Sequence, residues 1–167
     1  MLPFTLPDSP AYAVAFSGGA DSRLLLELTL RALLERFGED GRHRVIALHL
    51  HHGIRGEEAD RDLAFCEEVC TELGIQLISE RVNIPAMAEE LGESLETAAR
   101  KARYDFFGRV MDERRIGMLL TAHHADDSVE TFFLNLFRGT GIHGLHGIRP
   151  VSIQAIKQSS NQAITII

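Results

Sequence analysis

The sequence predicts an α/β protein with a doubly wound, mostly parallel β-sheet and helices on both of its faces. Short apolar runs typical of buried strands alternate with longer segments whose apolar residues recur at helical spacing. Because a strand–helix–strand unit is nearly always right-handed, this alternation favours parallel strands. Polar residues also gather directly after three of the strand-like runs, where ligands bind in sheets of this kind.

In the first half of the chain the expected strands and helices alternate. They are a strand at about 11–16, a helix to about 37, a loop at 38–41, a buried strand at 45–50 and an acidic helix at about 57–73. The strands are short apolar runs, and the first helix starts directly after a small polar turn. The second helix carries Leu63, Cys66 and Val69 on one apolar face, and Gly74 ends it.

The second half continues the alternation and ends in an atypical tail. Its expected elements are a strand at about 76–82, a short helix at 86–91, a long helix at about 94–115, a strand at 118–121 and a helix at about 126–137. Gly92 interrupts the short helix, and Ser94 caps the long one. Four glycines between positions 139 and 147 indicate a flexible loop. Residues 151–167 are rich in Gln, Ser and Ile, with one Lys and no acid.

The composition is ordinary, with 167 residues of which 45% are hydrophobic and 25% charged. This length suits one domain with a sizeable core. Two cysteines make a disulfide framework implausible, so the cytoplasm is the expected compartment. We expect no membrane association, because no apolar run approaches the length of a span and the N-terminus lacks a signal-peptide pattern.

The net charge of −7 argues against strong binding of nucleic acid by this chain alone. The charge is uneven, with acids concentrated in segment 57–73 and bases in segment 98–115. The basic segment offers one face to a polyanion. Its default interpretation is a solvated helix face.

Residues 17–22 predict a phosphate-binding loop between the first strand and the first helix. They are Ser17, Gly18, Gly19, Ala20, Asp21 and Ser22. The glycines let the backbone turn with its amides outward, and these amides and the helix dipole converge on an anion. Ser17 and Ser22 add hydroxyl donors, and Asp21 is interpreted as an Mg²⁺ ligand because a carboxylate alone would repel phosphate. The alternative is a turn whose Asp or Ser merely caps the helix.

The pattern S-G-G-x-D-S resembles the pyrophosphate loop of the ATP pyrophosphatases, the PP-loop superfamily, which cleave ATP between the α and β phosphates to adenylate a substrate. No Lys follows the glycines, so the loop is not a Walker A motif. Further segments resemble the tRNA(Ile)-lysidine synthetase family. They lie at 49–58, 94–104, 121–127, 130–131 and 138–141. His51 departs from the family pattern, which usually has Asn there.

The resemblance implies an adenine nucleotide alpha hydrolase-like, Rossmann-like fold. It implies a PP-loop ATP pyrophosphatase domain at 1–150, with 151–167 as a tail, because nothing resembles the downstream tRNA-binding regions of the family. The implied activity is an ATP-dependent ligase that adenylates C2 of the wobble cytidine of tRNA(Ile) and joins it to free lysine, forming lysidine, AMP and pyrophosphate. We expect the chain to be a truncated form of such a ligase, with a homodimer as the assembly to consider.

By motif position, the same resemblance implies the roles of individual residues. The implied catalytic residues are Asp21, Arg103, His123 and Asp127. The implied ATP-binding residues are Ser17, Gly18, Gly19, Ala20, Asp21, Ser22, His52 and Arg55. Asp21 and Asp127 are the implied Mg²⁺ ligands, and Arg103 is expected to contact phosphate.

Other interpretations of the same residues stay open. A PP-loop tRNA 2-thiolation enzyme would use a cysteine pair, whereas Cys66 and Cys70 fall in mid-helix on an apolar face, where core packing is the expected role. A non-catalytic adenine-nucleotide-binding module is the alternative from another class. The histidines at 49, 51, 52, 123 and 124 also allow a zinc site, although no Cys joins them.

Overall fold

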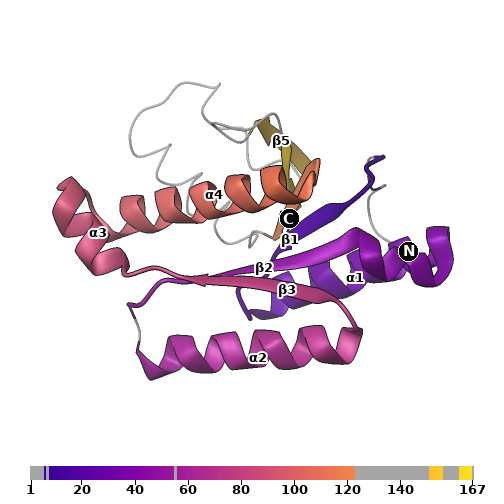
Figure 1. Ribbon diagram of the computed structural model, residues 1–167, viewed down its shortest axis with the longest axis horizontal. Helices are drawn as coiled ribbons and strands as arrows, with labels where there is room; N and C mark the ends of the chain where they lie inside the picture. The colour runs from indigo at the N-terminus through magenta and orange to yellow at the C-terminus, as the bar shows by residue number, and fades with distance from the viewer. Residues whose placement is uncertain (1–5, 7, 55, 123–150, 156–161, 167) are drawn as a thin grey trace, which may run out of the picture.

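A six-stranded sheet with the strand order β3-β2-β1-β4-β6-β5 forms the centre of the structure (Figure 1). This computed structural model describes residues 6, 8–54, 56–122, 151–155 and 162–166. The strands are β1 (Tyr12–Ala15), β2 (Val45–His51), β3 (Gln76–Arg81), β4 (Met118–Ala122), β5 (Val151–Ala155) and β6 (Gln162–Ile166). All neighbouring pairs are parallel except β5 with β6. The predicted doubly wound, mostly parallel sheet is therefore confirmed.

The strand order places a topological switch point beside β1. From β1 the chain moves outward to β2 and β3, and it then returns to the other side of β1 to form β4. Connections on the two sides of such a point diverge, which leaves a crevice at the carboxyl ends of the two strands. The residues that follow β1 therefore open directly onto the place where a ligand is expected.

Helices cover both faces of the sheet and create two apolar cores. Their bounds are α1 (Ala20–Phe37), α2 (Glu57–Leu73), α3 (Ile84–Leu91) and α4 (Leu95–Arg114). Tyr12 and Val14 point to the core under α1 and α2, whereas Ala13 points to the core under α3 and α4. This alternation is the period of two of a β-strand, and Figure 1 shows α4 and α2 on opposite sides of the sheet.

The helix ends follow from local sequence. The side chain of Ser94 accepts a hydrogen bond from the Thr97 amide at 3.2 Å, so the predicted cap of the long helix is confirmed. Asn83 caps α3 in the same way through the Ala86 amide, so this helix begins two residues earlier than predicted. Gly74 ends α2 in the left-handed conformation, as predicted.

Two segments differ from the sequence predictions. The loop predicted at 38–41 is wrong, since Gly38–Arg44 forms a 3-10 helix, η1. A Cβ at Gly41 would lie 2.5 Å from the Leu33 backbone, so the segment is held against α1 by a contact that only glycine permits. Residues 151–155 and 162–166 form β5 and β6, because β6 pairs with the outer edge of β4. The helix predicted at 126–137 lies outside the described residues.

In the described part of the chain, no helix has the length and apolar character needed to cross a membrane.

Candidate functional site

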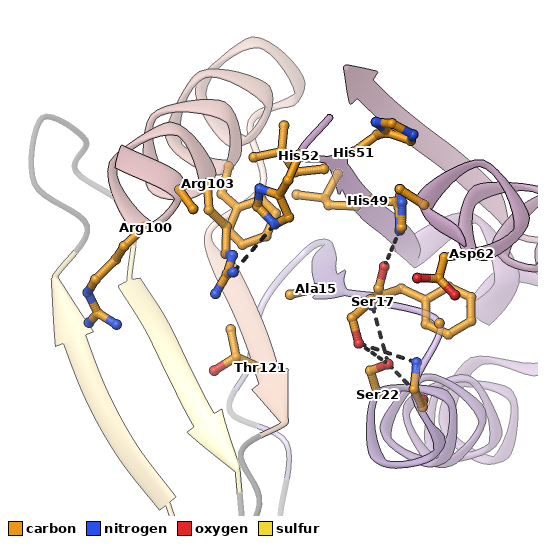
Figure 2. A pocket seen from close by; sticks show the side chains of 18 of the residues that line it. Ala15, Ser17, Ser22, His49, His51, His52, Asp62, Arg100, Arg103 and Thr121 are labelled. Carbon is orange, nitrogen blue, oxygen red and sulfur yellow. Dashed lines mark hydrogen bonds between the residues drawn. The ribbon is translucent and has the colours of Figure 1, made fainter. Parts of the chain in front are cut away.

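A cavity of about 800 Å³ lies at the carboxyl ends of β1, β2 and β4, at the switch point of the sheet (Figure 2). Its walls come from the turn after β1, the ends of β2 and β4, the first part of α2 and one face of α4. This volume is in the range of small-molecule and cofactor sites. The predicted meeting of the polar clusters after β1 and β2 is therefore what the structure shows, and Thr121 of the third cluster lines the same cavity.

The turn after β1 is shaped by its own two hydroxyl groups. The Ser22 hydroxyl donates to the Gly19 carbonyl at 2.9 Å and lies 3.1 Å from the Ser17 hydroxyl. Ser17 in turn accepts from the Gly19 amide at 3.3 Å. Ser22 is also buried. The sequence suggested that both hydroxyls point to a phosphate, whereas here they hold the turn closed.

The first turn of α1 is left without a side-chain cap. Its N-cap is Gly19, which has no side chain, so no side-chain cap hydrogen bond reaches the amides of the first turn from the N-cap residue. The alternative in which Asp or Ser merely caps the helix therefore does not describe this turn. Uncapped first-turn amides and the positive end of the helix dipole favour an anion at this position.

Two buried side chains, His49 and Cys66, contact the backbone carbonyl of Phe16, directly before the turn. The Nδ1 atom of His49 lies 2.9 Å from the Phe16 carbonyl, so Nδ1 carries the proton and donates. The Cys66 sulfur lies 3.4 Å from the same nitrogen. Burial lowers the pKa of His49 and raises the pKa of Cys66 to about 12, so both groups are neutral near pH 7. The predicted packing role of Cys66 and Cys70 is confirmed, because both are buried in the core under α1 and α2.

Replacement of Gly18 by alanine should disturb this turn through its backbone. Gly18 has a φ of +90°, which an L-residue adopts only with strain of about 1–3 kcal/mol. The added Cβ itself fits, since the Cys66 sulfur lies at 3.5 Å. We expect ATP affinity to fall by about tenfold, the equivalent of roughly 1.4 kcal/mol, measured by calorimetric titration.

Gly38→Ala is the matched control, because Gly38 also has a positive φ, +62°, with no atom within 4 Å of the added Cβ. This variant should lose stability to a similar extent and keep its ATP affinity. Equal ATP affinities in the two variants would contradict a binding role for the turn.

The opposite wall of the cavity carries His52 and Arg103. The Nε2 atom of His52 lies 3.5 Å from the Arg103 guanidinium, which can only donate (Figure 2). Burial, followed by the charge of Arg103, lowers the pKa of His52 to about 4. Burial also lowers the pKa of Arg103. At pH 7 the wall therefore presents one neutral imidazole and one guanidinium cation.

The lowered pKa of His52 makes stability depend on pH. As the pH falls through about 6.5, the imidazole binds a proton in the unfolded chain, whereas in the folded protein it binds one only near pH 4. The unfolded state then holds more protons, so the free energy of unfolding falls across this window, by at most about 3 kcal/mol for this group. Urea unfolding at pH 7 and pH 4.5 should show a smaller pH effect in His52→Gln than in the wild type. The exposed His43 is the control, and an equal loss of pH dependence in His43→Gln would refute the assignment.

The structure brings together part of the predicted site. Ser17, Gly18, Gly19, Ser22, His52 and Arg103 line the cavity. Ala20 and Asp21 are exposed in the first turn of α1 and are not among the lining residues. Arg55, His123 and Asp127 lie outside the described residues.

The sequence analysis did not assign Arg100 and Tyr104 of α4, two side chains with polar groups that line the cavity, to the site. Arg100 and Tyr104 face the cavity together with Arg103. The basic segment was interpreted as a solvated face, although a spacing of three and four residues puts these side chains on one side of a helix. From that spacing, the sequence could have predicted that Arg100 and Tyr104 lie on the same side of the helix as Arg103.

The three histidines of β2 and its end do not converge. His49 bonds to Phe16, His51 lies 3.2 Å from Asp60, and His52 faces Arg103. Within the described residues, no group of three or more His, Cys, Asp or Glu side chains is arranged to hold a metal ion.

The uncapped glycine turn at the switch point, facing a cationic wall across one cavity, defines an α/β domain of the nucleotide-binding class. The chain belongs to the PP-loop domain family, whose model matches residues 4–167. Membership of this ATP-using family implies that the chain binds ATP.

Several curated relatives of the chain are tRNA(Ile)-lysidine synthases. The chain is 42% identical over 140 residues to the tRNA(Ile)-lysidine synthase of Clostridium perfringens, which covers 83% of the chain and 28% of the relative. It is 43% identical over 145 residues to that of Bacteroides thetaiotaomicron, with 87% and 32% covered. For Chlorobaculum tepidum the identity is 38% over 141 residues, with 83% and 40% covered. The chain thus spans between 28% and 40% of the length of these relatives.

A solved structure supports the fold. The U34-tRNA thiolase NcsA from Methanococcus maripaludis superposes with a TM-score of 0.58 at 22% identity, covering 81% of this chain and 46% of that chain. At this identity the likeness concerns the arrangement of strands and helices.

Proposed function

We propose that this chain carries the adenylation site of a tRNA(Ile)-lysidine synthase, an ATP-dependent carbon–nitrogen ligase. One observation carries the proposal: the turn at 17–19, His52 and Arg103 line the same cavity at the switch point. The curated relatives, 38–43% identical, support the choice of ligase. The fold alone would not decide between this activity and others on the same scaffold.

The proposed reaction has two steps. C2 of the wobble cytidine is a poor electrophile, because its oxygen is a poor leaving group. Transfer of AMP to that oxygen releases pyrophosphate and makes the C2–oxygen bond easy to break. The ε-amine of free lysine then attacks C2, AMP departs with the oxygen, and the amine loses a proton, which yields lysidine.

The residues that line the cavity bind different phosphate groups of ATP through their positive charges and amide dipoles. The Gly18 amide and the amides of the first turn of α1 stabilise the negative charge that develops on the departing pyrophosphate, because the Ser17 and Gly19 amides bond to the two serine hydroxyls of the turn. Arg103, on the opposite wall, binds the phosphate that is transferred. By motif position, we also assign His123 to the α-phosphate, Arg55 to the nucleotide and Asp127 to the metal or the substrate amine.

A magnesium ion fits the donor set at the turn. Mg²⁺ in nucleotide sites is held by one or two carboxylates together with substrate phosphates. Asp21 supplies such a carboxylate beside the turn, and Asp127 is proposed as the second. When bound, the ion neutralises charge on the phosphates of ATP.

We also propose the bounds of the ligase domain, its substrates, its compartment and its assembly. The ligase domain predicted at 1–150 is extended through β6, because the segment predicted as a tail at 151–167 supplies β5 and β6 of the same sheet. The proposed substrates are tRNA(Ile) and free lysine, and the proposed compartment is the cytoplasm. Association into a homodimer stays a prediction that light scattering tests.

Incubation with labelled lysine, ATP and tRNA(Ile), followed by nucleoside analysis, tests the proposal. Label in lysidine and an equal amount of AMP are expected from the wild type, whereas Asp21→Ala and His123→Ala should show neither. Equal labelling in these variants would refute the site, and nucleotide binding without any labelling or pyrophosphate release favours the non-catalytic module.

A sulfur-transfer activity based on the two cysteines is disfavoured by their surroundings. Burial raises the pKa of Cys66 to about 12 and that of Cys70 to about 11, whereas sulfur chemistry needs the thiolate. Both thiols are also buried away from the solvent.

A further inference from the structure

The cationic side chains between positions 100 and 109 of α4 divide into two groups. Lys101 and Arg109 each lie beside a carboxylate, Glu93 and Glu80 respectively. Six arginines outside α4 also lie beside a carboxylate, whereas Arg44 donates to the Pro10 carbonyl. The six are Arg23, Arg31, Arg36, Arg42, Arg61 and Arg81. In the described part of the chain, neither Arg100 nor Arg103 has a carboxylate partner, and both line the cavity.

The two arginines are close enough to repel each other. The charge of Arg100 is one of the factors that lower the pKa of Arg103. Two unneutralised cations one helical turn apart are unfavourable unless an anion lies between or beside them. In a chain of net charge −7 this local arrangement favours an anionic ligand at the cavity.

Arg100 is held in place by an aromatic ring. Its guanidinium lies 5.1 Å from the centroid of the Tyr104 ring. That ring packs edge-on against Phe107, with the centroids 6.3 Å apart, and Phe107 is buried in the core under α3 and α4. A guanidinium held over a ring by a cation–π contact keeps N–H groups available for a phosphate, and arginine is well suited to phosphate and nucleic-acid recognition.

The position of Arg100 separates it from the pyrophosphate loop. Figure 2 shows Arg103 between Arg100 and Ser17, with Arg100 extending away from His52. A nucleotide whose phosphates lie on the loop reaches Arg103 first. Arg100 then remains available to a second substrate.

We propose that Arg100, stacked on Tyr104, binds a backbone phosphate of the single-stranded RNA that presents the cytidine to the cavity. This subsite rests on the proposed function, because it assumes that the second substrate is an RNA loop. It adds a second positive charge beside Arg103 on this wall of an otherwise acidic chain. It also fixes the strand, so that one base can enter the cavity while its neighbours stay outside.

Two measurements on the same variants test the subsite. The first is the affinity for a fluorescent anticodon stem–loop of tRNA(Ile), by anisotropy at several salt concentrations. The second is the rise in melting temperature caused by ATP with magnesium. The variants are Arg100→Gln, Arg100→Lys and the control Arg114→Gln, which removes the same charge from an exposed position at the end of α4.

Arg100→Gln should weaken RNA binding by about tenfold and reduce the slope of log affinity against log salt by about 0.7–1. Arg100→Lys should fall between this variant and the wild type, because lysine keeps the charge without the planar stack. Arg114→Gln should change the affinity by less than about twofold, in line with one distant surface charge screened by salt. The ATP-induced rise should stay the same in all three variants.

Other results overturn the subsite and separate it from the proposed function. Equal RNA affinities of Arg100→Gln and Arg114→Gln contradict it, as does a loss of the ATP effect in Arg100→Gln without a change in RNA affinity. If the wild type responds to ATP but binds no RNA at low salt, the subsite fails and the nucleotide site stands. If the wild type does not respond to ATP, the proposed function itself fails.

Discussion

Asp21→Asn is expected to lower the rate of tRNA-dependent pyrophosphate release by about 10²–10³-fold, the effect of removing one group that stabilises developing charge in an active site. The side chain lies in the first turn of α1, beside the turn proposed to hold the leaving group. Asparagine keeps the shape and removes the negative charge needed to hold magnesium there. The loss should therefore appear in kcat at saturating ATP, and raising the magnesium concentration should restore part of it.

Asp40→Asn is the matched control for this experiment. Asp40 is an exposed carboxylate in η1 and does not line the cavity. Its removal should leave the rate within about twofold, as for most surface substitutions. An Asp21→Asn enzyme as fast as Asp40→Asn would exclude a role for this carboxylate in the reaction.

Arg103→Ala is expected to reduce kcat/KM by about 10–10²-fold, which corresponds to a hydrogen bond to a charged group worth roughly 1.5–3 kcal/mol. The guanidinium faces the cavity without a carboxylate partner in the described residues, so its charge is available to a phosphate. Steady-state kinetics with varied ATP measures the loss, and Arg114→Ala, at the end of the same helix, should leave the constant nearly unchanged.

The same variant has an independent spectroscopic readout. Since the charge of Arg103 contributes to the low pKa of His52, its removal should raise that pKa from about 4 towards the ordinary value. Burial is the larger cause, so only part of the shift should disappear. An unchanged titration of His52 by NMR would contradict the placement of the two side chains.

Features decided by short stretches of sequence could be predicted. The turn at 17–22 depends on its own glycines and on the helix that follows it, and Ser94 caps α4 through a residue three positions away. The alternation of strands and helices predicted that the polar residues after the strands lie at one edge of the sheet, and the turn and His52 do line one cavity there. The strand order, and with it the switch point, came from the structure.

Features that depend on distant contacts could not be predicted. The 3-10 helix η1 exists because Gly41 approaches the backbone of Leu33 in α1, which no local pattern reveals. The strand β6 forms by pairing with β4, across more than thirty intervening residues of the chain. The proposed role of Arg100 depends on its lack of a carboxylate partner, whereas Lys101 and Arg109 have one, and the tertiary fold decides these pairs.

The hydrogen-bond partners of the serine hydroxyls and of His49 also depend on the folded structure. The sequence showed that Ser17 and Ser22 flank the glycines, but their mutual hydrogen bonds depend on the fold of the turn. The histidines at 49, 51, 52, 123 and 124 left a zinc site open as an alternative, whereas His49 bonds to the carbonyl of Phe16, directly after β1. Proximity along the chain did not determine which partner each side chain meets.

The central claim is that the turn after β1 binds the pyrophosphate part of ATP through its backbone amides. An NMR titration of the labelled protein with magnesium pyrophosphate tests it most directly. We expect the largest amide shifts at Gly18, Gly19, Ala20 and Asp21, saturating with a single affinity that Gly18→Ala weakens. Amide shifts that leave these four residues unchanged, or an affinity that Gly18→Ala does not alter, would contradict the claim.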